Sequence, residues 1–382
     1  MRSGHPWIFT DSIEKVNKEG TSGDIAIIFS HSKNKVIGVG LYDPNSPIRI
    51  KMLHHGSGAK LNSDFFSEKI NKAFALRVSL LETDTNSYRL IFGENDGFPG
   101  LIADVYNKVL VIKLYSAIWI PYFETILKLL IEVSNVETVV LRMSRSLQQT
   151  KNPYGLKEGQ VIYGTLEDEV IPFVEHGVQF SANVIKGHKT GYFLDHRNNR
   201  KRVGELSKNK TVLDVFSYAG GFSVHALANQ AKEVTSVDIS KQALALAIEN
   251  GKLNSFTGKH KTLAGDAFEI LRNLNAEKKT FDVVVIDPPS FAKSKDEIDK
   301  AKKKYKQLAE LGVQLTSKGG MLVLASCSSR IIAEDFFAIN KEVLDKQSRP
   351  YTLQNSTQHD VDHPISFKEG AYLKTGYYRF TK

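Results

Sequence analysis

The C-terminal half of the chain shows the most regular alternation of apolar and polar positions. Short β-branched runs occur at 212–216, 234–239, 283–289 and 321–326. Segments with helical spacing separate them, such as KQALALAIENGKLN and a longer one near 295–316. Strands that alternate with helices in this way form a mostly parallel sheet with helices on both faces. The pattern therefore predicts an α/β domain, which would bind its ligands beyond the carboxyl ends of the strands.

The beginning of the chain predicts smaller pieces. Residues 21–53 hold three short apolar runs separated by Gly, Asn, Asp and Pro, a pattern typical of a small β-rich domain. Helical spacing follows over 62–84, where Asn62, Ser63 and Asp64 are candidates for the helix cap. A helix is therefore expected directly after the β-rich piece.

The stretch from Tyr88 to about Gly164 predicts two strands, a helix and a further strand, with a hairpin turned around Asn107. Within it, the long apolar run at 109–133 is interrupted by charged residues and by Pro121, so it predicts a strand, a loop and an amphipathic helix. We expect three parts in all: a β-rich domain over 1–60, a central α+β domain over 61–170 and an α/β domain over 171–382.

Composition and charge narrow the class of protein. The chain is 41% hydrophobic and 24% charged, which is typical of a globular protein. Its start, RSGHPWIF, lacks the order of a secretory signal, so we expect a cytoplasmic protein, and a single cysteine agrees with a reducing compartment. The net charge of +9 suggests a polyanionic partner, because clustered Lys and Arg release counterions from phosphate, although many basic proteins are merely soluble.

Acidic residues follow or end three of the expected strands. Asp214 lies in DVFSYAGGFS, where Gly220 and Gly221 open a helix and let the backbone approach a ligand. Asp238, at the end of the second strand, could accept both ribose hydroxyls of a nucleoside cofactor, and Asp266 could accept from an adenine amino group. Each acid alone is more often a helix cap or a solvated residue, but three in register favour a cofactor site. The loop is neither GxGxxG nor a Walker A motif, so dinucleotide and P-loop sites are disfavoured.

These patterns resemble the class I S-adenosylmethionine-dependent methyltransferases. Eight segments spread over nearly the whole chain resemble, more narrowly, the RlmI-type large-subunit rRNA cytosine-5 methyltransferases. They are GHPWIF at 4–9, GENDGFPGLIADVY at 93–106, KTGYFLDHRNNR at 189–200, DVFSYAGGFSVHA at 214–226, VDIS at 237–240, DPPSFAKS at 287–294, SCSS at 326–329 and DHPISFKEGAYLK at 362–374. The combination is highly specific, whereas any one segment is not.

The resemblance implies an N-terminal β-barrel PUA domain that helps to bind RNA, a central EEHEE-type α+β domain and a C-terminal Rossmann-like catalytic domain. It also implies S-adenosylmethionine as the cofactor and 23S ribosomal RNA, naked or partly assembled, as the partner. No membrane partner is expected, and a homodimer stays open. GHPWIF lies almost at Met1, where relatives usually have an extra stretch, so the first PUA strand is expected to be shortened or the sequence truncated. Lys51 stands where Arg is common, which keeps the charge but loses bidentate phosphate contact.

Matched motif by motif, the resemblance also implies a set of cofactor-binding residues. The methionine end of the cofactor is expected to be lined by Asp214, Phe216, Tyr218 and Gly220, its ribose by Asp238 and its adenine by Asp266. The segment KTGYFLDHR is expected to cover the cofactor through Phe193, Asp195 and Arg197. Asp287 of the DPP motif is also expected to contact the cofactor. A plainer interpretation of KTGYFLDHR is a turn in which Asp195 caps the basic helix HRNNRKRV, and both can hold at once.

Cytosine-5 methylation would explain the presence of Cys327, the only cysteine. C5 of cytosine is a poor nucleophile, but a thiolate that adds to C6 makes C5 enamine-like, and a hydrogen bond at N3 supports this. Asp287 and Cys327 follow two strands that are expected to be neighbours, so both side chains should meet at one carboxyl edge. We therefore predict Cys327 as the nucleophile and Asp287 as its catalytic partner. Without that context, a strand-end cysteine is an ordinary apolar filler.

Other functions stay open. Exocyclic-amine methyltransferases, some of which modify guanine, carry an acid-or-amide, Pro, Pro, aromatic motif, and DPPSF has its aromatic, Phe291, one position late. A uracil-5 enzyme would use the same thiol chemistry. An idle RNA-binding or assembly protein would need neither Cys327 nor the acids. Another group of RNA cytosine-5 enzymes has a second cysteine just after the DPP-like segment, where this chain has Ser290, so the base that removes the C5 proton is unassigned.

Two further patterns concern metal and RNA. HDVDH at 359–363 spaces two histidines four apart, but Pro364 follows and no helical pattern supports the geometry, so no metal is expected. Basic residues follow the DPP loop and the cysteine loop, namely Lys293, Lys295, Lys300, the lysines at 302–304 and Arg330. A lysine run is usually a solvated helix face, but because this one starts at the expected catalytic edge, we predict that it contacts RNA phosphate.

Overall fold

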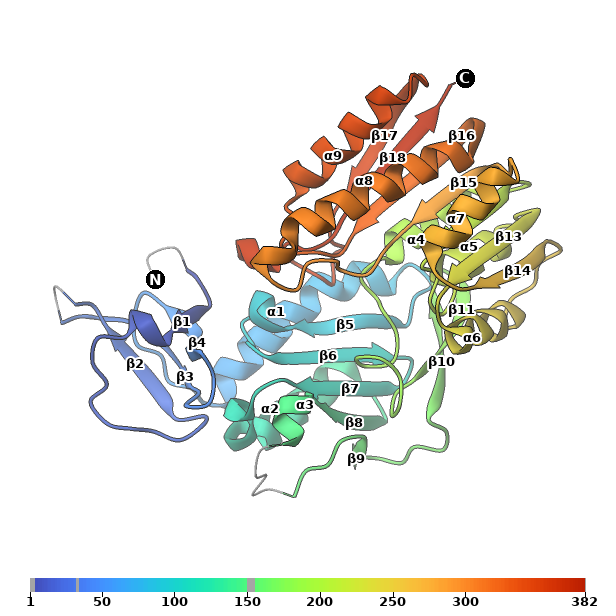
Figure 1. Ribbon diagram of the computed structural model, residues 1–382. Helices are drawn as coiled ribbons and strands as arrows, with labels where there is room; N and C mark the ends of the chain where they lie inside the picture. Colours follow the sequence, from blue (N-terminus) through green and yellow to red (C-terminus); the bar gives the residue numbers. More distant parts are fainter. Residues whose placement is uncertain (1–3, 32–33, 150–154, 382) are drawn as a thin grey trace. The chain divides into compact units, whose positions relative to one another are not determined.

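A computed structural model describes residues 4–31, 34–149 and 155–381 of the chain (Figure 1). Internal contacts divide the chain into two compact units. The first unit comprises 1–177, 181–194 and 361–370, and the second comprises 178–180, 195–360 and 371–382. Neither unit is continuous in sequence, whereas the three parts expected with boundaries near 60 and 170 are, and those boundaries stay predictions.

The first unit begins with a four-stranded antiparallel sheet in the order β1-β4-β3-β2. Its strands are β1 (Trp7–Phe9), β2 (Ile25–Phe29), β3 (Val36–Tyr42) and β4 (Ile48–His55). The last three are the apolar runs predicted over 21–53. Ile8, Ile28, Ile50 and Met52 form the small core of this sheet. Lys51 on β4 is 6% exposed, and its Nζ lies 2.6 Å from Asp43 Oδ2, so its charge is held inside the unit and not at the surface.

A five-stranded sheet in the order β5-β6-β7-β8-β9 forms the rest of the first unit. Its elements are α1 (Ser63–Leu81), β5 (Ser87–Phe92), β6 (Leu101–Tyr106), β7 (Val109–Leu114), α2 (Phe123–Ser134), β8 (Thr138–Met143), α3 (Arg145–Gln148) and β9 (Gln160–Tyr163). The Asn62 side chain accepts from Phe65 N and caps α1, as predicted. The β6–β7 hairpin turns at Asn107, whose φ of 55° is one that Asn tolerates better than most residues.

The second unit is built on a seven-stranded sheet in the order β14-β13-β12-β15-β16-β18-β17. Its strands are β12 (Thr211–Val215), β13 (Glu233–Asp238), β14 (Lys259–Ala264), β15 (Phe281–Ile286), β16 (Thr316–Ser326), β17 (Tyr351–Thr357) and β18 (Lys374–Phe380). The first five strands in that order are parallel, β18 pairs antiparallel with β16, and β17 pairs antiparallel with β18. A separate hairpin consists of β10 (Val170–Glu175) and β11 (Val178–Asn183), and all of it except residues 178–180 belongs to the first unit.

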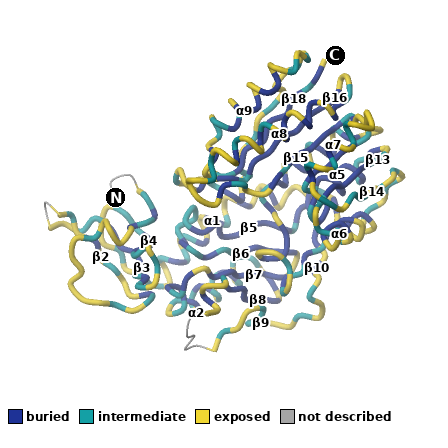
Figure 2. Tube along the Cα trace, in the orientation of Figure 1, coloured by how far each residue is buried: buried dark blue, intermediate teal, exposed yellow. Residues whose placement is uncertain are grey.

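Helices cover both faces of the seven-stranded sheet, as the alternating pattern predicted. They are α4 (Arg197–Leu206), α5 (Gly221–Ala228), α6 (Lys241–Lys252), α7 (Ala267–Ala276), α8 (Ile298–Leu315) and α9 (Ala333–Lys346). Successive residues of β15 show the two faces: Val284 and Ile286 belong to the core that includes α8 and α9, while Val283 and Val285 belong to the core that includes α4 and α5. The central strands are accordingly buried along their length (Figure 2).

Within the described ranges, no helix is both long and apolar enough to cross a membrane. The run at 109–133 forms β7, a short 3₁₀ segment and α2, as predicted.

Candidate active site

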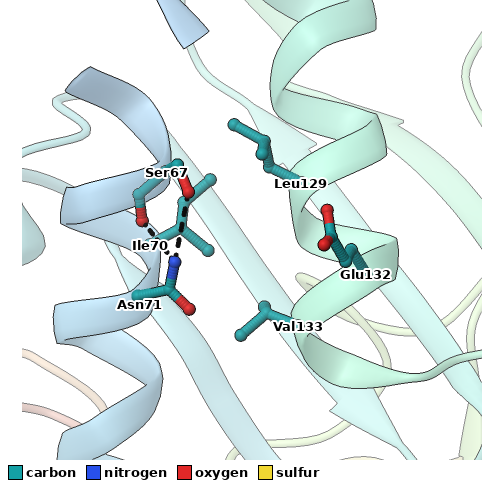
Figure 3. Close-up of a pocket in the computed structure, with 6 residues that line it drawn as sticks. All are labelled: Ser67, Ile70, Asn71, Leu129, Glu132 and Val133. Atoms are coloured by element: carbon teal, nitrogen blue, oxygen red, sulfur yellow. Dashed lines mark hydrogen bonds between the residues drawn. The ribbon is translucent and has the colours of Figure 1, made fainter. Parts of the chain in front are cut away.

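A hollow of about 240 Å³ lies between α1 and α2 in the first unit (Figure 3). Its lining consists of Ser67, Ile70, Asn71, Leu129, Glu132 and Val133. The amide of Asn71 donates to the backbone and side-chain oxygens of Ser67, so these polar groups satisfy their own helix. None of the six was expected to be functional, and their side chains offer one carboxylate but no thiol, imidazole or cation. The chemically distinctive residues gather in the second unit.

The buried carboxylate of Asp214 is the first element of that site. Asp214 on β12 is fully buried, and its Oδ2 accepts from Ser223 N at 3.0 Å and from Ser223 Oγ at 2.6 Å. Its Oδ1 is buried without a hydrogen-bond partner. Burial raises the pKa of Asp214 to about 7, although the hydrogen bonds from Ser223 act in the opposite direction. A buried, unpaired oxygen of this kind is suited to a ligand that brings its own hydrogen-bond donor.

The loop after β12 holds an unusual backbone conformation. Phe216 and Tyr218 have φ values of 64° and 47°, which cost non-glycine residues about 1 kcal/mol each or more. Gly220 has φ 78°, and a Cβ there would lie 2.7 Å from Ala247 Cβ, so only glycine fits. Asp238, at the end of β13, fixes the loop because its Oδ2 accepts from Tyr218 N at 2.9 Å. Such strain at a loop between two acids is typical of a ligand site.

These groups fit S-adenosylmethionine. The unpaired Asp214 oxygen suits the ammonium of a methionine moiety, and Asp238, which is only partly buried, retains acceptor capacity for ribose hydroxyls. Asp266 is exposed and caps α7, because its Oδ1 accepts from Glu269 N at 3.1 Å. Its contact with the adenine stays a prediction.

The KTGYFLDHR segment divides between the two units. Phe193 lies in the first unit and is 40% exposed. Asp195 lies in the second, where its Oδ2 accepts from Tyr372 OH at 2.9 Å. Helix α4 begins at Arg197 and its N-cap position is His196, one residue later than the predicted cap at Asp195. Arg197 is fully buried with its Nη1 3.1 Å from Asp360 Oδ2, so its charge is used within the second unit.

Asp287 and Cys327 lie at the ends of neighbouring strands. Strands β15 and β16 are parallel, with Ile286 opposite Leu324, and each of the two functional residues follows one of them. Cys327 Sγ lies 3.7 Å from Asp287 Oδ1. Asp287 N also bonds to Val215 O of β12, directly before the strained loop. The expected proximity is therefore present, while the catalytic roles of both residues stay predictions.

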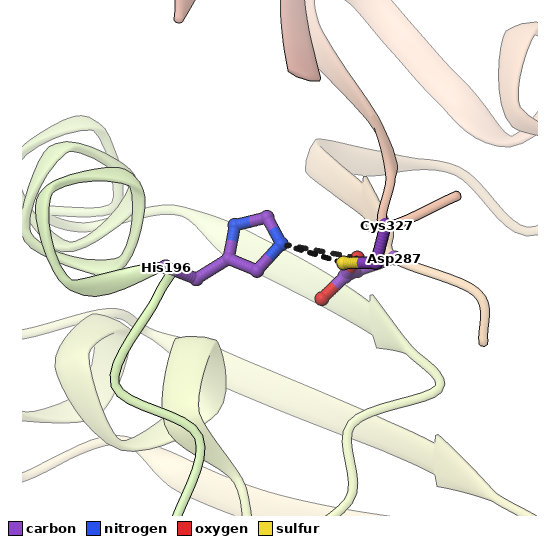
Figure 4. A group of neighbouring side chains, drawn as sticks. All are labelled: His196, Asp287 and Cys327. Atoms are coloured by element: carbon purple, nitrogen blue, oxygen red, sulfur yellow. Dashed lines mark hydrogen bonds and ion pairs between the residues drawn. The ribbon is translucent and has the colours of Figure 1, made fainter. Parts of the chain in front are cut away.

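A third residue joins them that sequence reasoning did not single out. His196 Nε2 lies 3.5 Å from Cys327 Sγ and 3.3 Å from Asp287 Oδ1, and the ring is 4% exposed (Figure 4). The ligand-type atoms of all three lie within 4.8 Å of one another. The only sequence signal was the position of His196 inside a motif segment, because 91 residues separate it from Asp287 in the chain.

The charges at this cluster oppose formation of a thiolate. Burial and the carboxylates of Asp287 and Asp195 raise the pKa of Cys327 well above its ordinary value, with Lys374 acting in the opposite direction. Burial lowers the pKa of His196, but the charge and hydrogen bond of Asp287 outweigh it, and the net pKa is raised. Lys374 is buried, donates to Ser328 O and Tyr372 O, and has its pKa lowered to about 8 by burial. Cys327 is thus a thiol at neutral pH unless a neighbour takes its proton.

Phe291 and the lysines after the DPP motif are partly committed to packing. The Phe291 ring lies 5.3 Å from that of Tyr305 and packs on the core beneath α8, with Lys304 Nζ 4.8 Å from its centre. Lys302 and Lys306 of α8 pair with Asp335 and Glu342 of α9. Lys304 and Arg330 are exposed too, but Lys304 lies over the Phe291 ring and Arg330 donates to Lys293 O. The other exposed lysines of the predicted set are Lys293, Lys295, Lys300 and Lys303, here termed the exposed lysine group.

The two histidines of HDVDH belong to different units. His359 Nε2 accepts from the backbone N–H groups of Tyr372 and Leu373, and His363 Nδ1 bonds to Asp362 at 2.8 Å. Over the described ranges, the cluster of His196, Asp287 and Cys327 is the one group of three potential metal ligands found.

Comparisons with known proteins agree with this geometry. A family of S-adenosylmethionine-dependent methyltransferases matches residues 98–379, and a PUA-like domain matches residues 1–55. A ribosomal RNA large subunit methyltransferase from Deinococcus radiodurans is 40% identical over 380 residues, covering 98% of this chain and 93% of that protein. The ribosomal RNA large subunit methyltransferase I of Aliivibrio fischeri is 34% identical over 379 residues, covering 98% and 95%.

Solved structures share the fold. A SAM-dependent methyltransferase from Streptococcus mutans has a TM-score of 0.82 at 21% identity, covering 99% of this chain and 96% of that one. A methyltransferase solved in complex with SAH has a TM-score of 0.83 at 20% identity with the same coverage. The chain belongs to the S-adenosylmethionine-dependent methyltransferases, in the family of the ribosomal RNA large subunit methyltransferases I, with a Rossmann-like catalytic fold and an N-terminal PUA-like domain.

Proposed function

We propose that this protein transfers a methyl group from S-adenosylmethionine to C5 of a cytosine in 23S ribosomal RNA, through a covalent adduct between Cys327 and cytosine C6. The observation that carries the proposal is the position of the only thiol in the chain, 3.7 Å from the Asp287 carboxylate at one strand edge. The neighbouring strand β12 holds the unpaired Asp214 oxygen and leads into the strained loop, and both suit the cofactor.

Each residue has a chemical task in this proposal. When bound, the cofactor supplies an electrophilic methyl group. The Cys327 sulfur forms a bond to C6, which moves the electron pair of the C5–C6 double bond towards C5. Asp287 accepts a hydrogen bond from the exocyclic amine of the cytosine and, when it carries a proton, donates one to N3, so the adduct is stabilised where charge develops. Loss of the C5 proton and cleavage of the S–C6 bond then restore the aromatic ring and the thiol.

The position of Phe291 favours this function over transfer to an exocyclic amine. An amine methyltransferase needs an aromatic ring that is available to stack on the target base. Phe291 is instead packed against Tyr305 and beneath Lys304, so stacking would require the ring to leave its core contacts. A uracil-5 enzyme would use the same residues, so the modified nucleoside itself must be identified.

The RNA substrate is inferred from the relatives and from charge. The relatives with 34–40% identity are named as large-subunit ribosomal RNA methyltransferases. A net charge of +9 and the exposed lysine group suit a polyanion, and a PUA-like domain is expected to add RNA affinity. We propose that the protein acts in the cytoplasm on 23S rRNA that is naked or partly assembled.

The test is transfer of labelled methyl from S-adenosylmethionine to unmodified 23S rRNA, followed by digestion to nucleosides, with the intact protein and with Cys327→Ala. We expect label in 5-methylcytidine, and its loss of at least about a thousandfold in the variant, because the nucleophile is removed. Ser290→Ala, which changes a neighbouring loop without touching the thiol, is the matched control and should retain label. Label in guanosine or adenosine that persists in Cys327→Ala would refute the proposal. Label in 5-methyluridine would show that the target base is uracil and not cytosine.

A further inference from the structure

His196 stands between the two residues assigned to the chemistry. Building on the proposed function, we propose that His196 is the group that takes the proton from the Cys327 thiol, so that the attacking thiolate forms beside an imidazolium. The distance of 3.5 Å between Nε2 and Sγ is within reach of an N···H–S hydrogen bond, which is longer than bonds between nitrogen and oxygen. The ring is 4% exposed, so water competes little for Nε2.

Asp287 contacts the same nitrogen and would orient the ring. Its Oδ1 lies 3.3 Å from His196 Nε2, close enough to attract an imidazolium. The carboxylate therefore favours the protonated ring that results from proton transfer. The same carboxylate disfavours a thiolate that has no cation beside it. Proton transfer to His196 removes this penalty, because the imidazolium then lies next to both the thiolate and the Asp287 carboxylate.

The other ring nitrogen has a partner that can follow the proton. Asn199 Nδ2 lies 3.0 Å from His196 Nδ1 and 3.2 Å from Thr375 Oγ1. Asn199 Oδ1 accepts from Thr357 Oγ1 at 2.6 Å and from Tyr377 OH at 2.8 Å. The three partners other than His196 are hydroxyls, each able to donate or accept, so the amide can turn by 180° without losing a bond. Asn199 can thus donate to a bare Nδ1 or accept from a protonated one, which a ring that gains and loses a proton requires.

Charged groups on every side of the cluster set its proton balance. Asp287 follows β15, Asp195 precedes α4, Arg200 lies on α4 and Lys374 on β18, and all four act on His196 or on Cys327. Tyr305 of α8 bonds to Ser326, next to the thiol. Arg200 lowers and the two acids raise the proton affinity of His196, and Lys374 is the one of these groups that favours the thiolate.

The step is balanced within the cluster. The Sγ–H bond breaks, its proton forms a bond to Nε2, and its electron pair stays on sulfur. That pair forms the S–C6 bond to the cytosine. When the S–C6 bond breaks at the end of the reaction, the imidazolium returns the proton to sulfur. No oxidant, reductant or metal is needed.

The experiment measures the thiolate directly. Cys327 is the only cysteine, so alkylation of the whole protein by iodoacetamide reports on this thiol alone. Its rate would be measured from pH 6 to pH 10 for the intact protein, His196→Gln, and His225→Gln as a control that removes another buried imidazole of the same unit. Melting temperatures, and the single-turnover methylation rate of each variant over the same pH range, would accompany it.

We expect the intact protein and His225→Gln to be alkylated with a rate that rises near neutral pH, as His196 loses the proton it holds and can accept that of the thiol. In His196→Gln the rise should move to the alkaline range, with a rate at pH 7.5 at least about tenfold lower, which corresponds to a pKa displaced by one unit. Gln keeps hydrogen bonding at that position but cannot carry the proton, so the pH at which the rate rises separates proton transfer from support of the fold.

Two results would overturn the inference, and a third would overturn only the proposed function. An alkylation profile that is unchanged in His196→Gln, with normal methylation that still requires Cys327, would reject the role of His196 while the proposed function stood. A shifted profile without any 5-methylcytidine formation in the intact protein would instead reject the proposed function alone. Stoichiometric zinc in the purified protein, with alkylation released by a chelator, would make the cluster a metal site and end the proton-transfer role.

Discussion

Removal of the Asp214 charge should stabilise the second unit in a way that depends on pH. Asp214 is fully buried, and its pKa is raised from 3.8 to about 7, chiefly by burial. Between these values the folded protein holds a proton that the unfolded chain has lost, so stability falls as pH rises through that window. A displacement of about 3 pKa units corresponds to ~4 kcal/mol, all of it lost above pH 7.

Asp214→Asn removes this penalty and should therefore gain stability relative to the intact protein as pH rises. Asn can still accept from Ser223, but its amide nitrogen would take the unpaired position of Oδ1 at a cost of about 1–3 kcal/mol that does not vary with pH. The informative quantity is thus the difference in the free energy of unfolding between the variant and the intact protein. This difference should change by ~3 kcal/mol from pH 4.5 to pH 8. For a domain of 150–250 residues this is roughly 6–12 °C in melting temperature.

The assay is thermal unfolding of both proteins across pH 4.5–8 without ligand. Asp282→Asn is the matched control, because hydrogen bonds from Thr211 outweigh burial and lower the pKa of that carboxyl in the same sheet. That variant should show no gain at high pH. SAH binding by calorimetry adds a second readout: the affinity of the intact protein should fall about tenfold from pH 8 to pH 6, as Asp214 is protonated. A melting difference for Asp214→Asn that is constant with pH would refute the reasoning.

Three other substitutions test the remaining parts of the site. Asp238→Asn should lower SAH affinity about tenfold in calorimetry, since one acceptor is lost from the ribose position, and equal affinity would place the ribose elsewhere. Phe291→Ala should lower the free energy of unfolding by about 2–3 kcal/mol and leave 5-methylcytidine as the product, because the ring packs on the core; a changed product nucleoside would contradict this. Replacement of the exposed lysine group by Gln should reduce the slope of log affinity against log salt for RNA by about 3, and an unchanged slope would show that these lysines do not contact phosphate.

The parallel part of the second unit could be predicted from local patterns because its signals are local. The β-branched runs became β12, β13, β15 and β16, and the acids at their ends fell at one edge because parallel neighbours end together. The proximity of Asp287 and Cys327 follows from the same rule. Asp266 shows the limit of such reasoning: a residue at the start of a helix has the same pattern whether it caps the helix or binds a ligand, and here it does cap α7.

His196 and the strands β17 and β18 were not predicted, and both omissions have the same physical cause. Strand β18 lies antiparallel to β16, and β17 lies antiparallel to β18 at the edge of the sheet. Their sequences carried no signal that distinguished them from loop. These two strands supply Thr357, Thr375 and Tyr377, whose hydroxyls hold Asn199, and Asn199 in turn contacts His196. The position of His196 therefore depends on contacts between residues that lie about 160–180 positions apart, which no local pattern encodes.

This dependence also separates the cluster into two parts with different structural support. Asp287 and Cys327 follow the neighbouring parallel strands β15 and β16, so loss of a single hydroxyl on β18 should leave their distance of 3.7 Å nearly unaffected. His196 is held from the other side, through one amide. Tyr377→Phe would remove one of the two hydroxyls that Asn199 Oδ1 accepts from, while the aromatic ring stays in the core. If His196 takes the proton of the thiol, loss of this hydroxyl should shift the pH dependence of Cys327 alkylation towards that of His196→Gln. We expect this effect although Tyr377 belongs to a strand that no pattern predicted and carries no group that reacts.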